Sequence, residues 1–80
     1  MKTYWPMAKY IYTTFSGKEN TEKLFTTEPA ITMQKALEQF SLWEGNFSII
    51  EAWIDVTEGG EKVDRLEVVR TWQIKGRSEK

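Results

Sequence analysis

The 80-residue chain contains no cysteine and no histidine. Without cysteine, the fold has no disulfide bond, and thiolate nucleophiles and thiolate zinc sites are excluded. Without histidine, it lacks the most frequent general acid–base group and the most frequent metal ligand. The usual nucleophilic triads are therefore absent. We expect a protein that is not an enzyme, with no catalytic residue, no cofactor and no bound metal.

Long hydrophobic runs and an excess of basic charge are also missing. No 18 apolar residues run together, and the first six residues lack the apolar segment of a signal peptide, so we expect a cytoplasmic protein that contacts no membrane. The net charge of −1 divides into +2 over residues 1–27, −6 over 28–61 and +3 over 62–80. A nucleic-acid-binding domain usually has a strongly basic face, which this distribution does not predict.

Aromatic residues, by contrast, are abundant. They make up 14% of the chain, with four tryptophans, and 40% of all residues are hydrophobic. This composition argues against intrinsic disorder, and large aromatic side chains suit a small core. The length predicts one domain over residues 1–80, in which the polar residues 76–80 form a flexible tail.

The first predicted strand covers residues 4–15. Its apolar residues alternate with period two, as in a half-buried strand. The odd positions, such as Trp5 and Met7, are the more apolar, so we expect them to face the core. Tyr10 and Tyr12 then point away from it. After a polar turn, residues 23–27 could form a short return strand.

A helix is predicted from Glu28–Pro29, because proline suits the first helical position and oxygen-bearing side chains there can cap the free backbone donors. Gly45 is expected to end it as a left-handed cap. One face of this helix carries a continuous apolar arc, made of Ala30, Met33, Ala36, Leu37, Phe40 and Trp43.

Residues 47–56 and 63–74 read as a β-hairpin around Gly59–Gly60. Its register decides which side chains share a face. A simple two-residue turn would place Trp53 opposite Leu66. A loop of three or five residues would instead place Ile54 opposite Leu66.

We prefer the loop with an odd number of residues, because it also sets Asp55 against Arg65 as a cross-strand ion pair. Glycine beside a β-bulge fits this choice. This register gathers one apolar face, made of Ile50, Ala52, Ile54, Val56, Leu66, Val68, Trp72 and Ile74.

The elements together predict a two-layer α+β domain of β-(β)-α-β-β order. A mostly antiparallel sheet of three to four strands carries one amphipathic helix on one face. The sequence leaves the strand order open.

A single helix leaves the other sheet face uncovered, and this face carries the candidate partner-binding residues. Monomers rarely expose large apolar patches without a use for them. We therefore expect a protein-interaction module that homodimerises or binds another protein. The candidate residues are Tyr10, Tyr12, Phe47, Ile49, Trp53, Arg65 and Val69.

Two alternatives remain for this face. The same aromatics could stack the bases of a single-stranded nucleic acid, although Glu51, Asp55 and Glu67 would repel its phosphates. Alternatively, a different register or a terminal segment removes the patch.

Acidic residues recur around the hairpin tip. Asp55, Glu58, Glu61 and Asp64 could hold Ca²⁺ or Mg²⁺, but their spacing is not that of an EF-hand. We interpret them as charges that keep the turn soluble.

Overall fold

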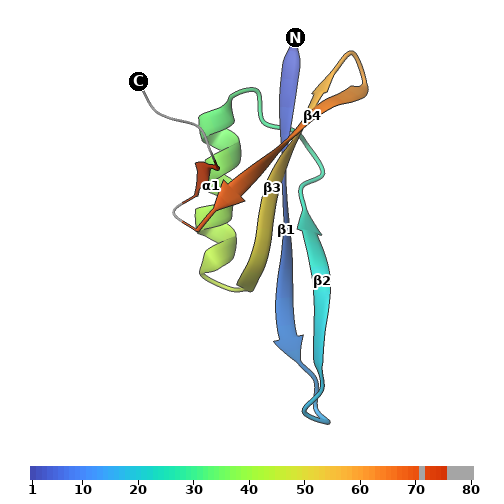
Figure 1. The fold of residues 1–80 in the computed structure, drawn as a ribbon, viewed down its shortest axis with the longest axis vertical. Coiled ribbons are helices and arrows are strands. Elements are labelled where there is room, and N and C mark those ends of the chain that lie inside the picture. The colour runs from blue at the N-terminus through green and yellow to red at the C-terminus, as the bar shows by residue number, and fades with distance from the viewer. Residues whose placement is uncertain (71, 76–80) are drawn as a thin grey trace.

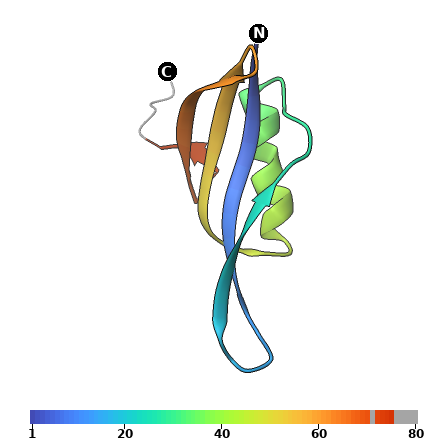
Figure 2. The same ribbon diagram turned by 90° about the vertical axis from the view of Figure 1, so that its right-hand side faces the viewer.

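The computed structural model describes residues 1–70 and 72–75. This part of the chain contains five strands and one helix, namely β1 (Lys2–Thr13), β2 (Glu19–Phe25), α1 (Met33–Glu44), β3 (Ser48–Glu58), β4 (Glu61–Val69) and β5 (Gln73–Ile74). The strands form one antiparallel sheet in the order β2-β1-β3-β4-β5, and α1 lies against one face of it (Figures 1 and 2).

The α+β class is therefore confirmed, with five strands where we predicted three to four. The predicted tail, residues 76–80, lies outside the described residues. Within the described part, no helix is both long and apolar enough to cross a membrane.

Strand β1 turns its smaller side chains toward the helix. Ala8 is fully buried in the same core as Ala36 of α1, and Tyr4 packs against this core. The prediction that the odd positions face the core is wrong, because alternation places Trp5 and Met7 on the opposite face. A small side chain at position 8 lets the helix lie close to the sheet, so size outweighs apolarity here.

Helix α1 begins at Met33, four residues later than predicted. Ala30 stays extended because it exchanges two backbone hydrogen bonds with Tyr4 of β1, with N···O distances of 2.7 and 2.8 Å. Thr32 is the N-cap, and its hydroxyl accepts a hydrogen bond from the backbone N–H of Lys35 at 3.2 Å.

The C-terminus of the helix also differs from its prediction. Gly45 has φ −68° and ψ −19°, a right-handed conformation, so the predicted left-handed cap is absent. Its backbone N–H bonds to the carbonyl of Trp43.

The apolar arc of the helix packs onto the sheet as predicted. Ala36 and Phe40 are fully buried, and α1 contacts β1 and β3. The helix residues of the arc that are partly buried against the core are Met33, Leu37 and Trp43, and Ala30 packs there from the extended segment before the helix. The sheet residues buried in the same core are Ala8, Ile54, Val56, Leu66 and Val68.

The β3–β4 hairpin has the preferred register but a different turn. Ile54 lies opposite Leu66, and Asp55 lies opposite Arg65. The turn nevertheless contains only Gly59–Gly60, with φ of 63° and 85°. Positive φ at both central residues is typical of a two-residue type I′ turn.

A β-bulge reconciles this short turn with the register. Thr57 pairs with Lys62, whereas Val56 pairs with Asp64, so Val63 is an extra residue in β4. The predicted bulge is therefore present, but it lies three residues beyond the glycines.

A second bulge lies in β3. Lys9 pairs with Glu51 while Tyr10 pairs with Ile49, which leaves Ile50 as the extra residue. Ile50 is consequently half exposed, and Ile49 packs against the core in its place. The prediction that Ile50 lies on the core face is wrong, because the bulge shifts the alternation.

Strand β4 ends at Val69, and the chain turns back to form β5. At this turn Trp72 has φ 60°, and its backbone N–H donates to the carbonyl of Val69 at 2.7 Å. Its indole stacks on Phe40, with ring centroids 5.5 Å apart, and its indole N–H donates to Glu44 at 2.9 Å. The predicted unbroken strand to Ile74 is therefore wrong, but Trp72 still packs against the core.

Strands β1 and β2 continue past the start of β3 as a two-stranded projection, which we call the arm (residues 12–20; Figures 1 and 2). At its tip the Thr14 N–H donates to Lys18 at 2.8 Å, and the Gly17 N–H donates to Thr14 at 2.9 Å. Gly17 has φ 83°, as this tight turn requires. The tip holds Phe15, whose side chain is fully exposed.

Candidate functional site

The predicted partner-binding residues do not share one surface. Trp53, Arg65 and Val69 lie on the face opposite the helix, which we call the open face. Tyr10, Tyr12, Phe47 and Ile49 lie on the helix side, because regular alternation in β1 continues from buried Ala8 to the two tyrosines. The prediction that all seven share a face is wrong, and the binding role of each residue stays a prediction.

On the helix side, the aromatic residues contact one another. The ring of Tyr10 lies 4.7 Å from that of Phe47 and 5.7 Å from that of Tyr12, centroid to centroid. Tyr10 is also paired with Ile49, which packs against the core. These contacts extend the core beyond the end of α1 toward the arm, so the cluster has a structural role.

Tyr12 is the most exposed member of this cluster. Its hydroxyl donates to Glu22 at an O···O distance of 3.4 Å. Partial burial of the ring, followed by the nearby Glu22 carboxylate, raises the pKa of Tyr12 above its ordinary value. The phenol therefore stays protonated near neutral pH and acts as a hydrogen-bond donor.

On the open face, Trp53 lies under the side chain of Arg65. The guanidinium carbon is 4.3 Å from the ring centroid, a cation–π contact. Trp53 is only 5% exposed although no helix covers it. The cation occupies the ring face that a nucleic-acid base would need.

The predicted ion pair between Asp55 and Arg65 does not form. Lys62 approaches Asp55 instead, with Nζ 3.4 Å from Oδ1. This oxygen is shielded from solvent and accepts no hydrogen bond, because the geometry satisfies the distance of an ion pair but not the angles of a hydrogen bond. The charge of Asp55 is thus balanced within the protein.

Next to this pair, the open face is hollowed. The hollow has a volume of about 320 Å³, and Trp5, Met7 and Phe25 form most of its apolar lining. Phe25 pairs with Met7 across β1 and β2 and is 64% exposed. The other residues that line the hollow are Thr26, Asp55, Thr57 and Lys62.

The wall of this hollow is fixed by hydrogen bonds. The indole N–H of Trp5 donates to the hydroxyl of Thr57 at 3.1 Å, and the same hydroxyl is 2.6 Å from that of Thr3. The polar edge of Trp5 is therefore satisfied inside the protein, and its apolar ring is held in place at the hollow.

Sequence reasoning missed Trp5, Met7 and Phe25 as surface residues. The apolarity of the odd positions in β1 was visible, but it was assigned to the core. Phe25 falls in a segment too short to show a period. For Trp5 and Met7 the signal was present and the facing of β1 was misjudged, whereas for Phe25 the segment gave no signal.

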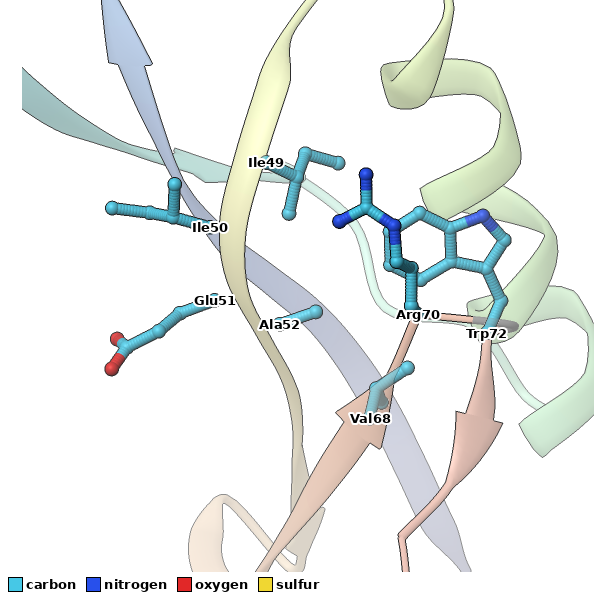
Figure 3. Close-up of a pocket in the computed structure, with 7 residues that line it drawn as sticks. All are labelled: Ile49, Ile50, Glu51, Ala52, Val68, Arg70 and Trp72. Atoms are coloured by element: carbon cyan, nitrogen blue, oxygen red, sulfur yellow. The ribbon is translucent and has the colours of Figure 1, made fainter.

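A separate notch opens where β4 diverges from β3 (Figure 3). Its walls include Ile49 and Ala52 of β3, with Arg70 and Trp72 beyond the end of β4. Within the described residues Arg70 makes no ion pair. One guanidinium in an open notch of about 100 Å³ suits many anions, so it indicates no particular ligand.

The acidic residues of the hairpin tip do not assemble. Among the residues that the structure describes, no group of three or more acidic side chains is placed to hold a metal ion. Asp55 points its charge at Lys62, and Asp64 accepts a hydrogen bond from the backbone N–H of Arg65 at 2.7 Å.

Comparison of the chain with protein-family models, curated proteins and solved structures gave no match. The function is therefore argued from the open face alone.

Proposed function

We propose that this protein is a non-catalytic interaction domain that forms a homodimer through its open face. The observation that carries the proposal is the aromatic hollow on a sheet face without a covering helix. Phe25, at 64% exposure, leaves most of its ring in water. Burying such surface against a second copy removes apolar area from water, which favours association.

The charge of the open face supports a protein partner. It is mixed rather than uniformly basic, with Lys9, Lys23, Lys62 and Arg65 beside Glu51, Asp55 and Glu67. Two copies related by a two-fold axis can match such charges across an interface. A phosphate backbone would meet acidic repulsion there, and the cover of Arg65 over Trp53 further weighs against base stacking.

Solution mass tests the proposal. Sedimentation or light scattering from micromolar concentrations upward should give a dimer at both low and high salt, because the contact is mainly apolar. Phe25→Lys places a charge at the hollow and should yield a monomer. Leu42→Lys is the matched control, since Leu42 is 67% exposed on the helix layer, and this variant should remain dimeric.

A wild-type monomer at every concentration would refute the homodimer. Loss of the dimer in Leu42→Lys with retention in Phe25→Lys would move the interface to the helix layer. Binding of a single-stranded oligonucleotide that weakens steeply with salt would instead favour the nucleic-acid alternative.

A further inference from the structure

Phe15 is a large aromatic residue that is not buried within its own chain. It occupies the tip of the arm, and its side chain is fully exposed. The turn around it is well ordered, because Thr14 bonds to Gly17 and Lys18 through the backbone and to Ser16 through its hydroxyl at 3.0 Å. The arm thus presents one large apolar side chain to the surroundings on a defined support.

The open-face hollow is complementary to such a side chain. Trp5, Met7 and Phe25 offer an apolar recess in which an aromatic ring can bury. The tip cannot reach the hollow of its own chain. Met7 lies eight residues before Phe15 along β1 and the turn, which is about 26 Å in an extended strand.

We propose that Phe15 of each copy seats in the open-face hollow of a second copy. This inference rests on the proposed homodimer and names its central contact. In such a dimer the Phe15 side chain of each copy is buried in the hollow of the other. The same contact therefore forms twice, as a self-complementary two-fold interface requires.

The spacing along β1 fits this arrangement. If two open faces pack with their β1 strands antiparallel, the tip at residue 15 lies near residues 5–7 of the other copy when the axis passes close to residue 10. The side chains next to the axis on the open face are then Lys9 and Ile11. Lys9 is already paired with Glu51 at 3.8 Å, and Lys23, which lies opposite Lys9 on the same face, adds one positive charge per copy near the axis.

Substitution of Phe15 is the first test. Phe15→Ser should raise the dimer dissociation constant by about a hundredfold, because each dimer loses two buried rings. Phe15→Leu keeps an apolar side chain and should change it only a few fold. Both variants should fold normally, since the side chain is fully exposed in the single chain. The thermal midpoint measured at concentrations too low for dimers checks this.

Cysteine cross-linking is the second test, and the chain has no cysteine of its own. Ser16→Cys lies at the tip, and Thr26→Cys lies in the lining of the hollow. When the two single variants are mixed and oxidised, bonds between positions 16 and 26 should outnumber 16–16 and 26–26 bonds. Ser41→Cys, which is exposed on the helix, is the control and should not link to position 16.

The outcomes separate the two proposals. A dimer whose affinity is unchanged by Phe15→Ser, or one dominated by 16–16 bonds, would overturn the tip-in-hollow contact while leaving the homodimer intact. A wild-type protein that stays monomeric would overturn both.

Discussion

Phe40 of the helix lies in the core that the helix shares with the sheet. It is fully buried, its ring stacks on Trp72 at 5.5 Å, and it meets the edge of Trp43 at 5.7 Å. A cavity at this position would remove contacts with the helix and with the chain after β4 at once.

We therefore expect Phe40→Ala to lower the free energy of unfolding by about 3–5 kcal/mol. Urea titration followed by tryptophan fluorescence measures this loss. Leu42→Ala, two residues along the same helix but 67% exposed, should change it by only about 0.5 kcal/mol. A loss below about 1 kcal/mol for Phe40→Ala would mean that the helix does not pack as described.

Tyr12 gives a second prediction at the scale of one residue. Its pKa is raised by partial burial and by Glu22, so the folded state holds the phenol proton more tightly than the unfolded chain. Stability should therefore be unaffected well below pH 10 and should fall as the pH rises through the ordinary tyrosine pKa of about 10.

Titration of the Tyr12 ring by NMR measures this shift. Glu22→Gln should bring the pKa of Tyr12 down toward its ordinary value. Glu28→Gln removes an acid that does not contact the ring and should leave the pKa unchanged. An identical pKa in wild type and Glu22→Gln would exclude the carboxylate as a cause.

Single residues also show where the sequence misled. The odd positions of β1 have the higher apolarity, yet small Ala8 faces the helix, because close packing of two layers depends on shape as well as on apolarity. Ile50 fits the alternating pattern of β3, but a bulge excludes it from the core. Neither the facing nor the bulge leaves a mark in the periodicity.

At the scale of elements, we expect alanine to have opposite effects on stability at Gly60 and at Gly45. Gly60 has φ 85°, which an alanine adopts only at a cost, whereas Gly45 has a right-handed conformation in which an added methyl group meets only an ordinary van der Waals contact. Gly60→Ala should therefore destabilise the protein by about 1–2 kcal/mol.

Gly45→Ala should stabilise the protein by about 0.4–1 kcal/mol, because alanine reduces the freedom of the unfolded chain. The added methyl group would lie 3.7 Å from the carbonyl oxygen of Leu42, an ordinary contact. Thermal unfolding of both variants measures the pair. Destabilisation by Gly45→Ala would show that a left-handed cap is needed after all.

Elements with strong local patterns were predicted correctly. The apolar arc of α1 follows from spacing alone. The preferred pairing of Ile54 with Leu66 is also present, but a two-residue turn and a β-bulge produce it instead of the odd-length loop that we expected. The start of the helix was missed because Ala30 is held extended by Tyr4, a partner 26 positions earlier. The break in the last strand was missed because Trp72 adopts a positive φ that its residue type disfavours.

At the scale of the whole molecule, the two-layer architecture follows from one amphipathic helix and several strands. The existence of an uncovered sheet face follows equally, since one helix covers one face. The identity of the residues on that face could not be predicted in the same way. Assigning the wrong side of β1 to the core places Tyr10 on the open face instead of Trp5 and Met7. The candidate site was thus predicted as a surface but not as a set of side chains.

If this surface joins two copies, association and folding are linked. Dimerisation stabilises the folded chain by mass action, so the midpoint of thermal unfolding should rise by about 3 °C or more for each tenfold increase in protein concentration. Differential scanning fluorimetry or calorimetry from about 1 to 100 µM covers the range expected for such an interface.

The same scan on Phe25→Lys supplies the control. This variant should unfold at one temperature at every concentration, since it lacks the dimer, and its midpoint should match that of the dilute wild type. A wild-type midpoint independent of concentration would contradict a folded dimer in this range. If the midpoint of Phe25→Lys still rises with concentration, the dimer contact lies elsewhere. Burying an unpaired lysine charge at position 25 would cost too much for the dimer to form through the hollow.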